Sequence, residues 1–314
     1  MSVSISDRIS RHAGEPDLVA ILTERLSPSE LSSLLLEVFH LHTHQITAPA
    51  LLTAYRNNRF VQPAAIDPLA YREFELLWLK TACKQGFEPL ELSPLAPLGS
   101  CSVVGTVHQN KILSATRGTE VVADATNMLA LESCIRRRAD GFPVESLHYC
   151  AAHRHVRAQA LSQPGFTAHF GVFCLTSAGR DTGHFQFERE NITRHIRLYL
   201  HLLQEKMQQQ DLKITLKSLD PDSGANLLFE GVLEQLQTQF PGIEISVSHL
   251  PKSGQQYYRE LQFGLLWQHD GRTFPIVDGG FTTWTQQLSG NRKERFLSSG
   301  IGLELLWKVL NGRV

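Results

Sequence analysis

Two short segments carry histidines at spacings that a transition-metal site could use. The residues are His40, His42 and His44 in the first segment, and Cys150, His153 and His155 in the second. Alternate residues of an extended strand share one face, so imidazoles at this spacing can reach a single ion. The first segment instead falls where a helix is expected to end, a position that histidine favours. Neither segment has an acid or thiol cluster that completes four ligands, so the sequence predicts no bound metal.

Motifs for nucleophilic catalysis and for phosphate binding are not found in the sequence. The five cysteines are scattered and include no Cys-x-x-Cys pair, which argues against a disulfide framework and a structural zinc site. Most of them are expected to be small core residues. No Ser-His-Asp pattern, Walker loop or Gly-rich dinucleotide motif is present. Residue types alone therefore assign no catalytic residue.

The composition is typical of a globular protein of the cytoplasm. The chain has 314 residues, of which 42% are hydrophobic and 19% charged, and its formal net charge is −1. This balance disfavours a broadly basic nucleic-acid-binding protein and a disordered chain. No apolar run reaches the roughly 18 residues of a membrane span, and the first residues lack the pattern of an export signal. We therefore expect a cytoplasmic protein with no membrane partner.

Residues 1–80 are expected to form an N-terminal helical segment. Ser27 and Glu30 flank Pro28 in a capping box, in which each of the two side chains accepts a hydrogen bond from the backbone of the other residue. Apolar residues at helical spacing follow this box. A second amphipathic helix is predicted over residues 69–85.

Residues 81–314 combine short strands with helices. Expected strands cover residues 103–106, 111–116, 147–152, 166–175, 212–219, 243–247, 261–267 and 273–277. Expected helices cover residues 124–138, 191–209, 227–240 and 302–310. The last two strands are joined at Asp270-Gly271, a dipeptide typical of a tight hairpin. The pattern predicts an α+β fold with a mainly antiparallel sheet flanked by helices.

Segments within residues 86–310 resemble, in order, the catalytic core of class II aminoacyl-tRNA synthetases. The resemblance is to the histidyl branch and to its non-charging relative, the regulatory subunit of ATP phosphoribosyltransferase. The segments are residues 86–94 for motif 1, residues 114–120 for the histidyl Leu-Arg-Pro-Glu-Gly-Thr segment, residues 153–159 with Phe166 for motif 2, and Tyr257-Tyr258, Gly279-Gly280 and residues 299–306 for the Tyr-Tyr, Gly-Gly and motif 3 signatures. The resemblance implies a class II synthetase-like core over residues 81–314.

The resemblance also implies a site that binds a ligand and its phosphates. Arg154 occupies the position of the motif 2 arginine, which in the family binds the α-phosphate and the amino-acid carboxylate, and Glu120 is the candidate for holding a ligand amine. The further candidates are Arg117 and Arg157 as other phosphate contacts, Gln159 as a polar contact, Tyr257 and Tyr258 as pocket walls, and Gly279 and Gly280 as points of close backbone approach. Adjacent residues of a strand point to opposite faces, so at most one tyrosine is expected to line the pocket directly.

Each candidate also has a purely structural interpretation. Arg154 can be an ion-pair partner on a strand, and Glu120 can be an acid at the start of a helix. The two glycines can form a simple turn, and Gln159 can be exposed. The sequence leaves these alternatives open.

Several charges that amino-acid activation needs are missing at the matching positions. Attack of a carboxylate on the α-phosphorus of ATP is supported by preorganised cations. Val156 replaces the motif 2 glutamate, Leu305 replaces the motif 3 arginine, and Ser253 stands near the position of the arginine upstream of the tyrosine pair. We therefore predict a degenerate adenylation site in a ligand-binding regulatory or accessory module that does not charge tRNA. The alternative is an ATP-dependent amino-acid-activating ligase or aminoacyl transferase that needs no recognition of whole tRNA.

The expected partners follow from the same resemblance. Motif 1 pairs two sheets across a two-fold axis in this family, so a homodimer is expected, and a regulatory role implies a protein partner. The small-molecule ligand is expected to be an amino acid or a nucleotide, and the cofactor stays open, with ATP and magnesium implied by the enzyme alternative. The sequence ends at Val314 without an anticodon-binding domain after motif 3, so whole tRNA is not expected as a partner.

Overall fold

An eight-stranded sheet forms the centre of the protein. The computed structural model describes residues 4–159, 165–219, 225–249 and 257–313. The strand order is β1-β5-β6-β11-β10-β9-β7-β8, in which the β1–β5 and β7–β8 pairs are parallel and the others antiparallel. The strands are β1 (Glu88–Pro89), β5 (Leu147–Val156), β6 (His169–Arg180), β7 (Leu212–Ser218), β8 (Glu244–His249), β9 (Arg259–His269), β10 (Arg272–Thr282) and β11 (Glu294–Ile301). The expected α+β fold with mainly antiparallel pairing is confirmed.

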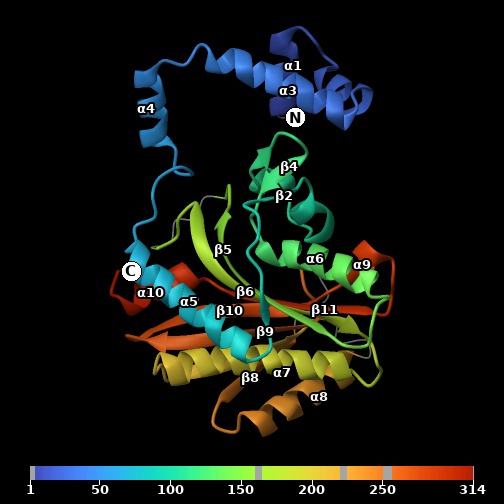
Figure 1. Cartoon of the computed structure of the whole chain (residues 1–314), viewed down its shortest axis with the longest axis vertical. Helices are drawn as coiled ribbons and strands as arrows, with labels where there is room; N and C mark the ends of the chain where they lie inside the picture. Colours follow the sequence, from blue (N-terminus) through green and yellow to red (C-terminus); the bar gives the residue numbers. More distant parts are fainter. Residues whose placement is uncertain (1–3, 160–164, 220–224, 250–256, 314) are drawn as a thin grey trace.

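Helices cover both faces of this sheet (Figure 1). One face carries α5 (Pro68–Lys84), α7 (Gln186–Leu200), α8 (Ala225–Gln239) and α10 (Leu303–Leu310), and the other carries α6 (Ala125–Ala139) and α9 (Trp284–Ser289). A small sheet of β2 (Leu95–Pro97), β4 (Thr119–Val121) and β3 (Ser114–Ala115) lies beyond α6. The main core is on the first face, where the rings of Trp78 and Phe173 pack with centroids 5.2 Å apart.

Two local predictions from the sequence are confirmed. At the start of α3 (Pro28–Thr43), the N–H of Glu30 donates to the hydroxyl of Ser27 at 3.3 Å, and the N–H of Ser27 donates to the Glu30 carboxylate at 2.8 Å. In the β9–β10 hairpin, Asp270 and Gly271 have φ angles of 48° and 72°. Positive φ at both central residues is the geometry of the tight turn that matches the twist of paired strands.

The expected strand over residues 103–106 is wrong. A short π-helical turn, Ser100–Val104, occupies this region. The carboxylate of Glu120 accepts hydrogen bonds from the N–H groups of Gly99 at 2.8 Å and Cys101 at 3.1 Å, so these backbone donors are satisfied without strand pairing. This contact spans about twenty residues of sequence, and local patterns do not reveal it. Strand β11 and helix α9 are likewise not predicted.

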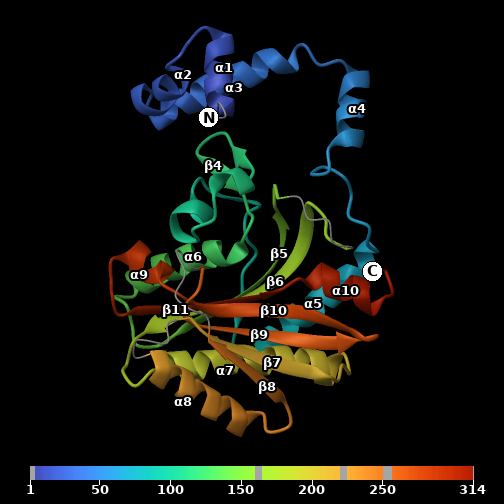
Figure 2. The same cartoon turned by 180° about the vertical axis from the view of Figure 1, so that it is seen from behind.

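The N-terminal helices stand apart from the core. Helices α1 (Ile5–Ala13), α2 (Leu18–Ala20), α3 and α4 (Ala48–Asn57) form an arch beyond the small sheet in both views (Figures 1 and 2). Helix α5, in contrast, packs into the main core through Tyr71 and Trp78. Among the residues that the structure describes, packing into the main core therefore begins with Ile66 and α5, inside the expected segment of residues 1–80. Within the described residues, no helix combines the length and the apolar character that crossing a membrane requires.

A chain of hydrogen-bonded side chains crosses the main core. It joins Tyr199 to Ser299 at 3.0 Å, Ser299 to His195 at 2.8 Å, His195 to Ser177 at 2.9 Å, and Ser177 to His148 at 2.9 Å. Tyr199 is fully buried, and Ser299 is its partner among the described residues, so the phenol donates to Ser299. Ser299 then donates to Nδ1 of His195, whose Nε2–H donates to Ser177, which donates to His148. Both imidazole tautomers are thereby assigned from the hydrogen bonds.

These histidines should make the protein less stable in acid. Burial, aided by the charge of Arg194, lowers the pKa of His148 from 6.5 to about 4. Between these two values the unfolded chain binds more protons than the folded chain, so the free energy of unfolding falls as the pH is lowered. We expect His148→Gln to make this fall shallower, by up to about 1.4 kcal/mol per pH unit, in urea unfolding between about pH 6 and pH 4.5. His12→Gln, at an exposed position of α1, is the control; identical slopes for the two variants would contradict the assignment.

A buried ion pair between α6 and β11 offers a test of the packing. Nε of the fully buried Arg137 lies 2.6 Å from the Glu294 carboxylate. Glu294→Gln removes the charge that compensates the guanidinium, so we expect the free energy of unfolding in urea to fall by about 3 kcal/mol. The control is Arg136→Ala, because Arg136 pairs with Glu88 at 3.3 Å on the surface and should contribute less than about 1 kcal/mol. Equal losses in the two variants would show that burial does not set the strength of the pair.

Candidate functional site

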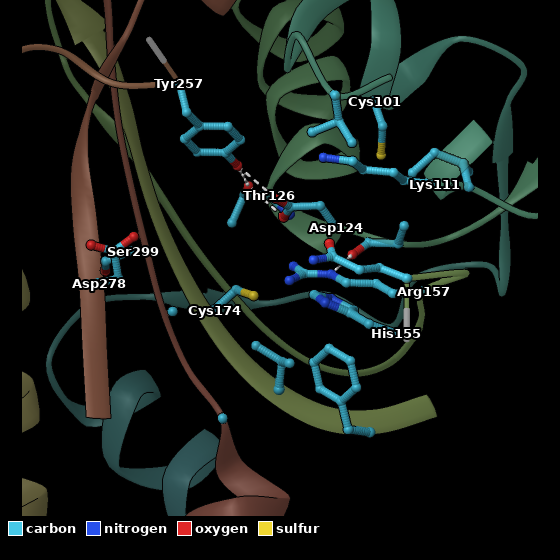
Figure 3. Close-up of a pocket in the computed structure, with 18 of the residues that line it drawn as sticks. Cys101, Lys111, Asp124, Thr126, His155, Arg157, Cys174, Tyr257, Asp278 and Ser299 are labelled. Carbon is cyan, nitrogen blue, oxygen red and sulfur yellow. Dashed lines mark hydrogen bonds between the residues drawn. The ribbon is translucent and has the colours of Figure 1, made fainter. Parts of the chain in front are cut away.

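A cavity of about 470 Å³ opens between the start of α6 and the strands β5, β6, β10 and β11 (Figure 3). Its apolar wall includes Val107, Ile112, Ala123, Phe170, Val172 and Ile301. Its polar and titratable residues, besides two cysteines, are Lys111, Asp124, Thr126, His155, Arg157, Gln159, Tyr257, Tyr258, Asp278 and Ser299. A cavity with an apolar wall and a limited number of polar groups is typical of a small-molecule site.

The first turn of α6 organises one wall of the cavity. Asp124 caps the helix and accepts hydrogen bonds from the N–H and the hydroxyl of Thr126, at 2.9 and 2.7 Å. The same carboxylate accepts the phenol of Tyr257 at 2.5 Å, and burial together with the Asp124 charge raises the pKa of Tyr257 well above its ordinary value. Nε2 of His155 accepts the N–H of Ala125 at 3.0 Å. Burial lowers the pKa of His155 to about 3, so this imidazole is neutral.

Two cations reach the cavity without an ion pair among the residues that the structure describes. The Nε of Arg157 donates to the carbonyl of Ala123 at 3.2 Å, and its guanidinium lies 5.4 Å from the centroid of the Phe170 ring. Lys111 is the second cation. Figure 3 shows both side chains extending from one side of the cavity, with Asp278 on the other side. The cavity therefore presents positive groups across from a carboxylate.

Asp278 is a cavity carboxylate with several polar neighbours, because hydrogen bonds from Gln262 and Tyr258 and the charge of Lys217 favour its ionised form. The side-chain amide of Gln262 donates to it at 2.6 Å. The side chain is open to the cavity, yet the surrounding protein desolvates it enough to raise the pKa of the carboxyl. A cationic ligand group beside Asp278 would favour its ionised form.

Four of the predicted site residues meet in this cavity. They are Arg157, Gln159, Tyr257 and Tyr258. The expectation that at most one tyrosine lines the pocket is wrong, because both residues precede β9 and the alternation of a strand does not apply to them. Their rings pack edge to face with centroids 4.8 Å apart, so both reach the same wall.

Arg154 does not line this cavity. Successive residues of β5 face opposite sides of the sheet, and Arg154 points to the side of α10, where it pairs with Glu304 at 2.7 Å. Burial acts to raise the pKa of Glu304, but Lys308 and Arg154 outweigh this effect and lower it. Arg154 borders a smaller hollow of about 210 Å³ that it shares with Tyr71. Three residues further along the chain, Arg157 is the arginine on the cavity side.

Glu120 and Arg117 also lie outside the cavity. Glu120 is fully buried, and besides the two N–H groups of the π-helical turn it accepts the side-chain amide of Gln109 at 3.0 Å. Its carboxylate is thus occupied by the protein itself. Arg117 is exposed in the turn between β3 and β4, and its N–H donates to the hydroxyl of Ser32 in α3 at 3.1 Å.

The glycine pair is required by packing of side chains. A Cβ at Gly279 would lie 2.5 Å from the Phe263 ring, and a Cβ at Gly280 would lie 2.7 Å from the Tyr258 ring. Neither glycine lines the cavity. Gly280 allows Tyr258 to lie against β10, so it shapes the cavity wall indirectly.

Six polar residues of the site were not predicted as ligand contacts: Lys111, Asp124, Thr126, His155, Asp278 and Ser299. Asp124 had a local signal, because an Asp directly before an amphipathic run is a common helix cap. His155 and Ser299 lie inside the segments that resemble motifs 2 and 3, whereas Lys111 and Asp278 have no signal in their immediate neighbours. Ser253, at the position near the upstream arginine of the histidyl enzymes, lies outside the described residues.

Comparison with known proteins finds relatives in structure and none in sequence. No model of a known protein family and no curated protein matches the chain. Apo histidyl-tRNA synthetase of S. aureus matches with a TM-score of 0.58 at 14% identity, over 79% of this chain and 69% of that chain. An ATP phosphoribosyltransferase regulatory subunit/histidyl-tRNA synthetase from Bacillus halodurans matches with a TM-score of 0.57 at 13% identity, over 82% and 83%.

A third match is a putative threonyl-tRNA synthetase from Aeropyrum pernix, with a TM-score of 0.60 at 12% identity, over 77% of this chain and 60% of that chain. At identities this low, the structural similarity establishes the fold alone and assigns no activity to this chain. The expected architecture is confirmed: this chain has a class II synthetase-like core.

Proposed function

We propose that the chain is an amino-acid-binding module on a class II synthetase-like core, with a regulatory or accessory role and no tRNA charging. The observation that carries this proposal is the cavity, where Arg157 and Lys111 lie across from Asp278 and near Asp124. A free amino acid at neutral pH has one carboxylate and one ammonium group, so it can form charge-assisted hydrogen bonds with both kinds of residue. A ligand that carries charge of only one sign would leave either the cationic or the acidic residues of the cavity without an oppositely charged partner.

The remaining wall indicates the kind of side chain that the ligand carries. Ile112, Phe170 and Val172 are apolar, and His155 is neutral because burial lowers its pKa to about 3. A second ligand charge would be placed against these groups without compensation. We therefore propose an amino acid with an uncharged side chain.

The charges near the cavity support the loss of amino-acid activation. Leu305 packs against the main core, and Arg154 is paired with Glu304. In-line attack on ATP requires several cations around the phosphates. Among the described residues of the cavity, Arg157 and Lys111 are the cations that remain, and the proposed ligand carboxylate occupies them.

We also propose a homodimer joined through residues 86–94. β1 is the outermost strand at its end of the sheet, and its ladder with β5 covers two residue pairs. A short edge strand leaves backbone groups of its neighbour open to a second copy. A regulatory role further implies a protein partner.

Thermal unfolding with each of the twenty amino acids tests the ligand class. A ligand that binds the native chain raises its Tm. We expect at least one uncharged amino acid to do so, and Arg157→Gln to weaken its apparent affinity at least about tenfold, because charged hydrogen bonds are lost. Arg117→Gln, outside the cavity, should respond like the wild type. No stabilisation by any amino acid, or equal responses of the two variants, would refute the proposed site.

The enzyme alternative has one observation in its favour, because Arg157 and Lys111 can hold a phosphate as well as a carboxylate. Amino-acid-dependent exchange of pyrophosphate into ATP, with magnesium present, separates the two functions. We expect no exchange with any of the twenty amino acids. Exchange that disappears in Arg157→Gln and persists in Arg117→Gln would instead establish an activating ligase or transferase.

A further inference from the structure

Two imidazoles meet on the surface of the protein where α3 ends. Nε2 of His40, in the last turn, and Nε2 of His44, at the C-cap, lie 3.2 Å apart, and both residues are exposed. The ring centroids are 4.5 Å apart. His42 lies between them in the sequence but points to another face, because two residues along a helix are about 200° apart. Helical spacing thus selects two of the three histidines in this segment.

The second histidine segment, in β5, does not form such a pair. The ring centroids of His153 and His155 are 5.9 Å apart, and both residues are buried. Nε2 of His153 lies 3.2 Å from the carbonyl oxygen of Ser93, and Nε2 of His155 accepts the N–H of Ala125. These nitrogens are therefore used by the backbone, whereas the pair on α3 is open to solvent.

The distance between the two Nε2 atoms on α3 matches that between two ligands of one metal ion. Zinc–nitrogen bonds are about 2.0–2.1 Å long. Two nitrogens bound at this length are about 2.9 Å apart when they form a right angle at the metal, and about 3.3 Å apart in a tetrahedral site. The observed 3.2 Å lies between these values. The pair is therefore preorganised for chelation, and binding requires little movement of either ring.

We propose that His40 and His44 form a surface chelate for a divalent transition metal ion such as Zn²⁺ or Cu²⁺, both of which favour imidazole ligands. Histidines four residues apart on a helix share one face, an arrangement that binds zinc in other proteins. Among the described residues, no group of three or more His, Cys, Asp or Glu side chains is placed to hold an ion. The expectation from the sequence considered four protein ligands, whereas this site uses two, with water in the remaining positions.

Metal binding replaces a hydrogen bond between the two rings. When both imidazoles are neutral, the Nε2–H of one ring donates to Nε2 of the other, whose own proton is on Nδ1. The ion needs a lone pair on both Nε2 atoms. The donor ring therefore passes its proton through water to its own Nδ1, and both rings stay neutral when the ion binds.

The ion would reinforce the turn that ends α3. The N–H of His44 donates to the carbonyl of His40 at 3.4 Å, so the chelate spans the same turn as this long hydrogen bond. Its positive charge lies at the C-terminus of the helix, where the dipole favours cations. No residue of α3 is buried, so a link within the helix contributes to its stability without tertiary packing. Binding should therefore slow hydrogen exchange of the last α3 amides.

Calorimetric titration of the full chain with Zn²⁺, after metal is removed with a chelator, tests the site. We expect His40→Gln and His44→Gln each to weaken the tightest zinc site at least about tenfold, because the second imidazole of a chelate binds as an intramolecular ligand. Two controls should match the wild type. The first is His42→Gln in the same segment. The second is His201→Gln, because His201 lies 2.9 Å from the Glu205 carboxylate at the same spacing of four residues.

Electron paramagnetic resonance with one equivalent of Cu²⁺ reports the ligands directly. Echo modulation from the remote ring nitrogens distinguishes two bound imidazoles from one. We expect two in the wild type and in His42→Gln, and loss of this signal in His40→Gln. No zinc binding by the wild type, a single imidazole on its copper, unchanged zinc affinity in His40→Gln and His44→Gln, or loss of the site in either control would each overturn the proposal.

Discussion

The cavity depends on how the first turn of α6 is held. Asp124 caps this turn and also accepts the phenol of Tyr257, while His155 accepts the N–H of Ala125. These bonds tie the helix to β5 on one side and to the segment before β9 on the other. Arg157, directly after the end of β5, lines the cavity together with His155 of that strand. The start of α6 and the end of β5 therefore position two charged groups of the cavity, Asp124 and Arg157.

Local sequence signals predicted local structure well. The capping box of Ser27 and the hairpin at Asp270 depend on neighbouring residues, and both are confirmed. The site could not be predicted to the same degree, because strand alternation makes a one-residue error a change of face. Arg154 and Arg157 look equivalent in the sequence, yet only the second faces the cavity. The resemblance predicts Glu120 as a ligand contact, and its neighbours in the sequence do not indicate that its carboxylate accepts backbone N–H groups about twenty residues away.

The N-terminal helices differ in how far their apolar side chains are buried. Helix α5 belongs to the N-terminal helices by sequence, but Trp78 places it in the main core. The helices before it, such as α3 with Val38, leave their stripes in solvent. The boundary between helices that leave apolar side chains exposed and helices that pack into the main core falls between α4 and α5. Periodicity alone could not locate it, because both helices are amphipathic.

The hydrogen-bonded chain through the core has a fixed polarity. Its order is imposed at one end, where the phenol of Tyr199 has a proton to donate and Ser299 to receive it. Without that terminal donor, the hydroxyls and imidazoles could all reverse together and leave every bond intact. The phenol of Tyr199 thus sets the direction in which every hydrogen bond of the chain is donated. Ser299 borders the cavity, so one wall of the cavity belongs to a strand that also carries this hydrogen-bonded chain.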